Sequence, residues 1–268
     1  MAYKTVIYEK EHGVAIMTMN RPEVKNAFDQ TMSSEMIDVL TQAAKDPDVN
    51  ALIITGAGKA FCSGADVSYL KFTQETFPFQ STMESDVRGR DNVLTMVLKI
   101  RSLPKPVIAA VNGLAAGGGL SIALACDIRL ASEDASFNMI FTKRGVIPEA
   151  GSTYHLPRLV GTARALELIF TADTIRAAEA DRIGMVNRVL PADKLMPAAK
   201  EMARKFAQNA PLALGFAKEA VYRGTVEPNL AAHMDYEAYV IHVLFATQDF
   251  QEGIKSLMEG RPAKFKGK

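Results

Sequence analysis

The sequence predicts an α/β fold in which short buried strands alternate with helices. Two observations carry this prediction. Short, continuously apolar runs such as residues 51–55 and 107–111 are typical of strands that are buried on both faces of a sheet. Stretches in which apolar residues recur at helical spacing separate these runs, and such alternation favours parallel pairing.

The first third of the chain supplies a hairpin, a helix and a strand. Polar and apolar residues alternate on both sides of His12-Gly13, which predicts paired strands over 4–9 and 14–19. Asp29 or Thr31 is expected to cap a helix that runs to Lys45. Strand 51–55 follows. Residues 72–86 show no period and are interpreted as a loop beside a site, and a helix is expected over 91–101.

The stretch from Lys105 to Ser132 is the most apolar part of the chain. A strand over 107–111 is followed by Gly117-Gly118-Gly119, by an apolar run to Cys126 that suits a buried helix, and by a strand over 128–131. The first N–H groups of a helix have no intrahelical partner, and glycines let a negative oxygen approach them. These glycines could also serve tight packing alone, whereas their number argues against a membrane span.

The last third is mainly helical. One strand is expected over 185–189, and Asp127 is expected to cap or pair beside strand 128–131. We divide the chain into an α/β core over 1–200 and a helical region over 201–268 that serves self-association. From residue 192 onward, helices are expected over 192–208, 211–223, 229–247 and 249–258, and a basic tail follows them.

Composition narrows the possible partners. The 268 residues carry a formal charge of +1, so neither nucleic acid nor a membrane is indicated as a partner. Cys62 and Cys126 belong to no Cys/His cluster, so no metal site is expected. The N-terminal residues resemble neither an export signal nor an organelle leader, which favours a cytoplasmic protein.

Two small-residue turns follow neighbouring strands. Ser63-Gly64-Ala65-Asp66 comes after the strand that ends at Thr55, and the glycine triplet comes after the strand that ends at Val111. If the two strands pair, the N–H groups of Ala65 and Gly118 could converge into an oxyanion hole, which would stabilise an enolate. Two ordinary tight turns are the alternative.

Five motifs, taken together in their order and spacing, resemble the crotonase superfamily of enoyl-CoA hydratases and isomerases. They are Asn20-Arg21-Pro22 with Lys25-Asn26-Ala27, GKAFCSGADV from Gly58, KPVIAAVNGLAAGGG from Lys105, CDIRLAS from Cys126 and AxxIGMVNRV from Ala180. The resemblance implies a spiral of ββα units, a helical trimerisation region, often a dimer of trimers, and an acyl-CoA thioester substrate. Because coenzyme A would be part of the substrate, no separate cofactor is expected.

The resemblance also implies roles for individual residues. The N–H groups of Ala65 and Gly118 would bind the thioester oxygen. The residues expected to line the substrate and coenzyme A site are Val24, Lys25, Ser63, Gly64, Asp66, Val67, Leu114, Gly117, Ser121 and Phe141. Arg261, Lys264 and Phe265 in the basic tail would approach the coenzyme A of a neighbouring subunit.

The chain departs from the hydratase pattern at both catalytic acids. Ser121 and Phe141 stand where hydratases of this family carry glutamates, and neither residue is a useful base. Glu149, after Pro148, resembles the single glutamate of Δ3,Δ2-enoyl-CoA isomerases. One carboxylate can move a proton from the α carbon to the γ carbon, so the main prediction is an isomerase.

Other readings stay open. Glu149 could instead stabilise the start of a helix near Ser152. The enzyme could be a hydratase, or an acyl-CoA hydrolase or decarboxylase that uses the same enolate site. A minor variant of this alternative has Ser121 as a nucleophile. A non-catalytic acyl-CoA-binding protein is the alternative from another class.

Overall fold

The structure is a computed structural model that describes residues 3–66 and 93–268. The predicted site residue Val67 and the predicted loop 72–86 lie outside these ranges, as do the first two residues of the helix expected over 91–101.

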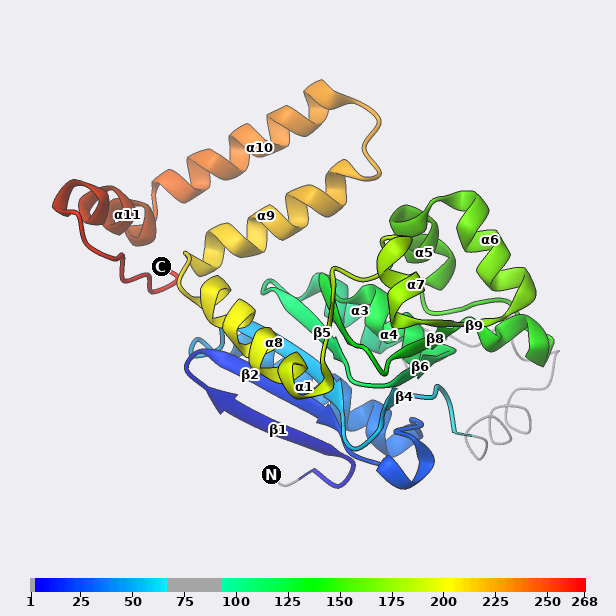
Figure 1. Ribbon diagram of the computed structural model, residues 1–268. Coiled ribbons are helices and arrows are strands. Elements are labelled where there is room, and N and C mark those ends of the chain that lie inside the picture. The colour runs from blue at the N-terminus through cyan, green and yellow to red at the C-terminus, as the bar shows by residue number, and fades with distance from the viewer. Residues whose placement is uncertain (1–2, 67–92) are drawn as a thin grey trace.

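A six-stranded sheet forms the centre of the α/β fold (Figure 1). Its strand order is β1-β2-β3-β5-β7-β10, and every neighbouring pair is parallel except the β1–β2 hairpin. All residues of β3 and β5 are buried, as their continuous apolar runs predicted. The bounds are Val6–Glu11 (β1), Val14–Met19 (β2), Ala51–Gly56 (β3), Val107–Val111 (β5), Ile128–Ser132 (β7) and Arg188–Leu190 (β10).

The last strand begins later than expected. The strand predicted over 185–189 is observed at Arg188–Leu190. Met185 and Val186 are buried in the turn before it, where the Met185 N–H donates to Ala180 O at 2.8 Å. The apolar character of these two residues therefore reflects burial in a turn.

A second sheet consists of four short strands, of which the sequence predicts only the one that starts near Ala135-Ser136-Phe137. Its order is β4-β6-β8-β9, with β4–β6 and β6–β8 parallel and β8–β9 antiparallel. Each strand has three residues, too few to show an alternation in the sequence. The strands are Ala60–Cys62 (β4), Leu114–Ala116 (β6), Ser136–Asn138 (β8) and Thr174–Arg176 (β9).

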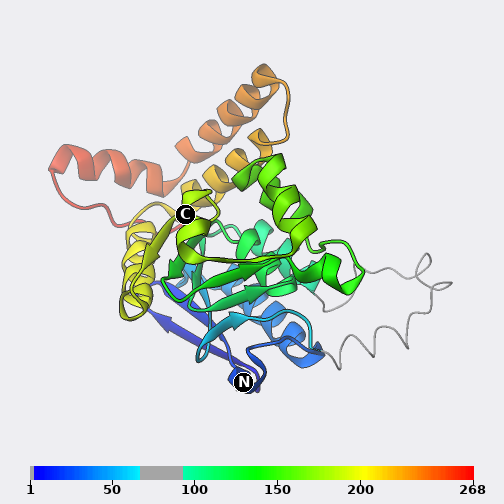
Figure 2. The same cartoon turned by 45° about the vertical axis from the view of Figure 1, so that its right-hand side comes forward.

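Helices cover both faces of the larger sheet. Helix α8 packs through Leu195, Ala199 and Ala203 on one face, and α1, α3 and α4 contribute to the core on the other (Figures 1 and 2). Asp29 is the residue that caps α1, since its carboxylate accepts the Met32 N–H at 2.8 Å. The bounds are Gln30–Lys45 (α1), Val93–Ser102 (α3), Gly118–Ala125 (α4), Ser152–Val160 (α5), Thr162–Thr171 (α6), Ala177–Arg182 (α7) and Ala192–Ala207 (α8).

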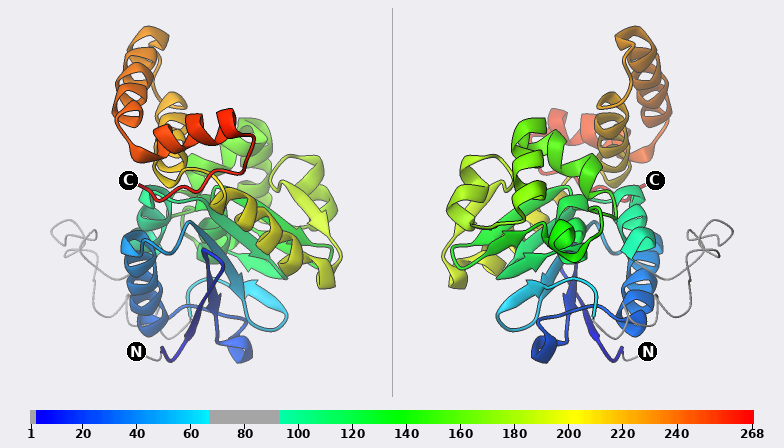
Figure 3. Two further views of the ribbon diagram at one scale, coloured as in Figure 1. Left: turned by 90° about the vertical axis from the view of Figure 1, so that its left-hand side faces the viewer. Right: turned by 90° about the vertical axis from the view of Figure 1, so that its right-hand side faces the viewer.

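The chain ends in three helices, α9 (Pro211–Gly224), α10 (Leu230–Phe245) and α11 (Gln248–Glu259). Helix α10 stands clear of the α/β core (Figures 1 and 3). The tail folds back on α11, where the buried Asp249 carboxylate accepts the N–H groups of Lys266 and Gly267 at 2.7 and 2.8 Å. None of the helices in the described ranges is long and apolar enough to cross a bilayer.

Candidate active site

The two small-residue turns lie against each other. Their strands β4 and β6 pair in parallel, with Ala60 opposite Leu114 and Cys62 opposite Ala115, so both turns leave the same edge of the small sheet. A Cβ atom on Gly64 would lie 3.1 Å from Ala116 O and 3.5 Å from Gly118 N. The neighbouring pair β3–β5, from which this contact was predicted, is also observed, although β4 and β6 hold the turns directly.

The hydrogen bonds around Ala65 direct its N–H away from its neighbour Phe28. The Phe28 N–H donates to Gly64 O at 2.9 Å, and the Asp66 N–H donates to Phe28 O at 2.9 Å. In such a parallel bridge the central residue, Ala65, turns its own N–H to the opposite side. The turn itself lies next to the glycine triplet, because a Cβ on Gly64 would be 3.5 Å from Gly118 N.

Gly118 supplies the second donor. It is the first residue of α4, so its N–H has no intrahelical partner, whereas the Gly117 N–H is used by Asn138 O at 3.0 Å. Within residues 3–66 and 93–268, neither the Ala65 nor the Gly118 N–H donates to a protein acceptor. The two free donors on touching turns have the arrangement that an oxyanion hole requires.

Glycine is required at these positions for steric reasons. A Cβ on Gly118 would lie 2.7 Å from Phe28 Cζ, and a Cβ on Gly119 would lie 2.2 Å from Cys62 O. Phe28, which is fully buried, thus contacts one donor residue and is hydrogen-bonded to the turn that carries the other. Sequence analysis did not single out Phe28.

Glu149 lies in the loop between the 3₁₀ turn Ile140–Arg144 and α5. Its backbone carbonyl is 3.2 Å from the Ser121 Oγ, which places it beside the first turn of the helix that begins with Gly118. The N-cap of α5 is Gly151, and no side chain caps that helix. Glu149 therefore does not cap α5 through its side chain, but it precedes the first turn of that helix, so the alternative that its charge stabilises the helix start stays open.

The Glu149 carboxylate has no neutralising partner. In the described part of the chain it accepts no hydrogen bond and forms no ion pair, and desolvation by the surrounding protein raises its pKa. The side chain is nevertheless exposed to solvent. Phe141 is buried, whereas Ile147, two residues before Glu149, leaves 79% of its surface exposed.

The two positions that carry acids in hydratases hold buried, non-acidic side chains. Phe141 exposes 6% of its surface and Ser121 none. The Ser121 Oγ lies 2.6 Å from the Ser152 Oγ and near two backbone carbonyls, and no histidine is among its partners. The nearby His155 has its pKa lowered to about 4 by burial and by three arginines, so it is neutral at pH 7. Ser121 thus lacks the adjacent base that a nucleophile requires.

The residues expected around coenzyme A form two groups. Val24 and Lys25 lie next to the first turn, since Ser63 donates from its N–H to Lys25 O at 3.0 Å and from its Oγ to Val24 O at 3.3 Å. Asp66 forms an ion pair with Arg21 at 3.0 Å, which supports a structural role for this acid. Leu114 lies on β6, opposite Ala60.

The second group lies on the C-terminal tail. Arg261 pairs with Glu252 and Glu259 at 2.6 Å each, the Lys264 N–H donates to Glu252, and Phe265 approaches Gly253. All these contacts are with α11. They do not place the tail beside Val24 and Lys25 within a single chain. The expected contact with the coenzyme A of a neighbouring subunit stays a prediction.

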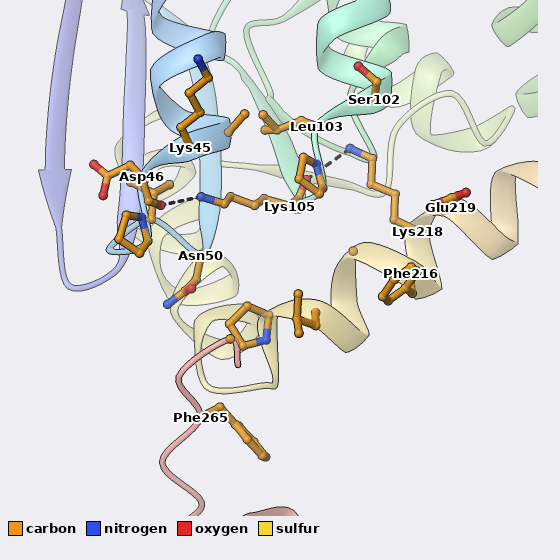
Figure 4. Close-up of a pocket in the computed structure, with 18 of the residues that line it drawn as sticks. Lys45, Asp46, Asn50, Ser102, Leu103, Lys105, Phe216, Lys218, Glu219 and Phe265 are labelled. Atoms are coloured by element: carbon orange, nitrogen blue, oxygen red, sulfur yellow. Dashed lines mark hydrogen bonds between the residues drawn. The ribbon is translucent and has the colours of Figure 1, made fainter. Parts of the chain in front are cut away.

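A large cavity lies elsewhere. It measures about 830 Å³ and opens between the end of α1, the α3–β5 connection, α9 and the tail (Figure 4). Of the predicted site residues only Phe265 lines it. Two of its four lysines are engaged, since Lys105 Nζ donates to Ala43 O and Asp46 O at 2.6 Å, and Lys218 Nζ donates to Ile100 O at 3.1 Å. No group of three or more His, Cys, Asp or Glu side chains in the described ranges could hold a metal ion.

Comparison with known proteins gives consistent results. The family model described as enoyl-CoA hydratase/isomerase matches residues 9–268. The chain is 39% identical to crotonyl-CoA hydratase of Syntrophomonas wolfei over 99% of both chains, and 40% identical to short-chain-enoyl-CoA hydratase of Clostridium acetobutylicum over 97% of both. The crystal structure of enoyl-CoA hydratase from Bacillus anthracis superimposes with a TM-score of 0.90 at 34% identity, and covers 99% of this chain and 100% of that one.

The names of these relatives favour hydratases over isomerases, and the isomerase-like character of the Glu149 loop stays a prediction. The fold agrees with that of the solved relative, and the sequence matches the family model, over nearly the whole chain. The chain therefore belongs to the enoyl-CoA hydratase/isomerase family, within the crotonase superfamily that its motifs indicated.

Proposed function

We propose that this enzyme moves the double bond of a 3-enoyl-CoA to the 2-position, with Glu149 as its only acid–base group. The observation that carries the proposal is the unpaired, desolvated carboxylate of Glu149 on a loop that contacts the helix of Gly118. Asp66, the acid next to Ala65, is already paired with Arg21.

In this mechanism the ionised Glu149 removes a proton from the α carbon. The electron pair moves toward the thioester carbonyl, whose oxygen becomes negative and accepts hydrogen bonds from the Ala65 and Gly118 N–H groups. The resulting dienolate extends to the γ carbon. The protonated Glu149 then returns the proton there, which leaves the double bond conjugated with the thioester and restores the free base.

Hydration of a 2-enoyl-CoA is the second candidate, because the relatives at 39% and 40% identity are named as hydratases. Hydration requires one group to activate water and a proton donor for the α carbon. With Ser121 and Phe141 at the two hydratase positions, Glu149 would have to perform both tasks in turn.

The test follows the absorbance of the conjugated enoyl thioester with trans-3-enoyl-CoA and with trans-2-enoyl-CoA separately. We expect an increase with the 3-enoyl substrate, and a decrease of kcat by about 10²–10⁴-fold in Glu149→Gln, as for loss of a general acid–base. Glu133→Gln, which alters an exposed acid on another loop, is the matched control. Loss of the 2-enoyl band that survives in Glu149→Gln, with no activity on 3-enoyl-CoA, would overturn the proposal in favour of hydration.

We further propose that coenzyme A enters only as part of the substrate and that the chain associates into trimers or dimers of trimers. The support for association is the apolar surface of the C-terminal helices, on which Leu230, Leu257 and Met258 are each more than 70% exposed.

A further inference from the structure

Two serine hydroxyls form a buried pair beneath the candidate active site. Ser121 on α4 and Ser152 at the start of α5 both have no exposed surface, and their Oγ atoms lie 2.6 Å apart. The two residues are 31 positions apart in the sequence, so the pair joins separate segments. Nothing in the proposed proton transfer uses either hydroxyl directly.

The pair converges on the backbone of Glu149. The Glu149 carbonyl accepts the Ser152 N–H at 3.0 Å and also the Ser152 hydroxyl, and it lies 3.2 Å from the Ser121 Oγ. A carbonyl oxygen has two lone pairs. The two contacts from Ser152 therefore satisfy it, and the Ser121 hydroxyl is left to donate within the pair or to Gly117.

The other end of the pair reaches the candidate oxyanion hole. The Ser121 Oγ lies 3.3 Å from Gly117 O. This carbonyl and the Gly118 N–H belong to the same rigid peptide unit. Contacts through Ser121 and Ser152 thus link the peptide unit of Gly117 and Gly118, which carries one candidate oxyanion-hole donor, with the backbone carbonyl of Glu149, the candidate base.

The turn after Glu149 needs such support. Ala150 has φ +51° and Gly151 has φ +74°, so two consecutive residues adopt the left-handed conformation. For a residue with a Cβ, such as Ala150, this conformation is unfavourable and persists only where surrounding contacts impose it. The contacts at the Glu149 carbonyl are made immediately before this turn.

We infer that Ser121 and Ser152 are positioning residues that fix the Glu149 carboxylate relative to the Gly118 N–H. The inference rests on the proposed role of Glu149. Because the pair touches backbone and no substrate atom, its loss should change the rate of proton transfer more than the binding of the acyl-CoA. Because Ser121 acts on Glu149 through Ser152, removing the Ser121 hydroxyl from the Ser152→Ala variant should have little further effect.

The experiment compares Ser121→Ala, Ser152→Ala and the double variant with the unaltered enzyme, with kcat and KM measured separately on 3-enoyl-CoA. Exchange of the α proton with deuterated solvent is the second measurement. We expect kcat and exchange to fall together by about 10–100-fold in each single variant, as for a misplacement near 1 Å, with KM changed less than about threefold. The double variant should be no slower than the slower single variant.

Ser33→Ala is the matched control. Ser33 on α1 is also fully buried, but its hydroxyl has no hydrogen-bond partner in the described structure. This variant therefore reports the effect of removing a buried hydroxyl as such, and its kcat should stay unchanged. Should an alanine variant fail to fold, the nearly isosteric cysteine variants, which are weak donors, take its place under the same criteria.

Three outcomes would overturn the inference: unchanged kcat in both single variants, losses that multiply in the double variant, or an equal loss in Ser33→Ala. Each is distinct from failure of the proposed function, which would appear as full activity of Glu149→Gln.

Discussion

Glu149 is partly desolvated by the surrounding protein and forms no ion pair within residues 3–66 and 93–268. Desolvation disfavours the ionised form, so it raises the pKa of the carboxyl group and makes the carboxylate a stronger base than one in water. A lysine or arginine at contact distance would have the opposite effect. Such a carboxylate suits repeated acceptance and return of one proton.

The raised pKa predicts the acid limb of the pH profile. Proton abstraction needs the ionised form, so kcat/KM should fall at low pH with an apparent pKa above the ordinary glutamate value of 4.5. Measurement of kcat/KM on 3-enoyl-CoA between pH 4 and 9 checks this. An acid limb at or below 4.5 would contradict the assignment of Glu149 as the base.

The same shift predicts a stability effect. A raised pKa means that the native state holds the proton more tightly than the unfolded state, so ionisation of Glu149 destabilises the fold as pH rises through the native pKa. The free energy of unfolding of Glu149→Gln, minus that of the unaltered protein, should therefore be larger at pH 7 than at pH 4. Urea unfolding at the two pH values measures the difference, and Glu133→Gln should show none.

At the scale of elements, one buried ion pair fixes α9 on the core. Lys218 Nζ lies 2.9 Å from the Asp127 carboxylate, and the two side chains expose 8% and 16% of their surface. Asp127 also accepts the Tyr222 hydroxyl at 2.6 Å and the Val107 N–H at 2.7 Å. The expectation that Asp127 pairs beside β7 is confirmed, although the partner comes from a helix 90 residues later in the chain.

We predict that Lys218→Met lowers the free energy of unfolding by about 3 kcal/mol, the lower end of the range for breaking a buried pair, because Asp127 keeps two other donors. The double variant Asp127→Asn/Lys218→Met should recover part of this loss, since no uncompensated charge remains. Urea unfolding measures both, and an effect below about 0.5 kcal/mol in Lys218→Met would contradict the prediction.

The elements also show what sequence alone can predict. Helix α1 and strands β2, β3 and β5 follow from apolar spacing. A helix with one long apolar face buries that face, and a continuous apolar run is buried on both sides of a sheet, so the pattern determines the element. Strands β4, β6 and β9 have three residues each and owe their pairing to distant partners. The donors at Ala65 and Gly118 were predictable from motifs, whereas the contact of Ser121 with Ser152 depends on how two loops meet in space.

At the scale of the whole molecule, α10 is the exceptional element. Apolar residues predominate in it although it carries Asp235 and Glu237, and Val240 is its only buried residue in the single chain. Leu230, Met234 and Tyr239 each expose more than half of their surface. A helix of this kind is normally covered by protein on several faces.

We therefore predict self-association, with a molar mass three or six times that of one chain. Light scattering coupled to size exclusion measures it. The double variant Leu230→Glu/Met234→Glu should reduce the mass toward that of the monomer, since both side chains are exposed in the single chain and the fold should tolerate the change. A monomer at micromolar concentration for the unaltered protein would contradict this.

The two candidate oxyanion donors are main-chain N–H groups, and this has a consequence for how the enzyme can evolve. Exchange of a side chain leaves a main-chain donor in place unless proline is introduced or the backbone is displaced. The acid, in contrast, resides on side chains at positions 121, 141 and 149 in this family pattern. Descent can thus conserve thioester activation while the acid changes its position between a helix, a 3₁₀ turn and a loop. A small combinatorial library at these three positions would sample the reactions open to this scaffold.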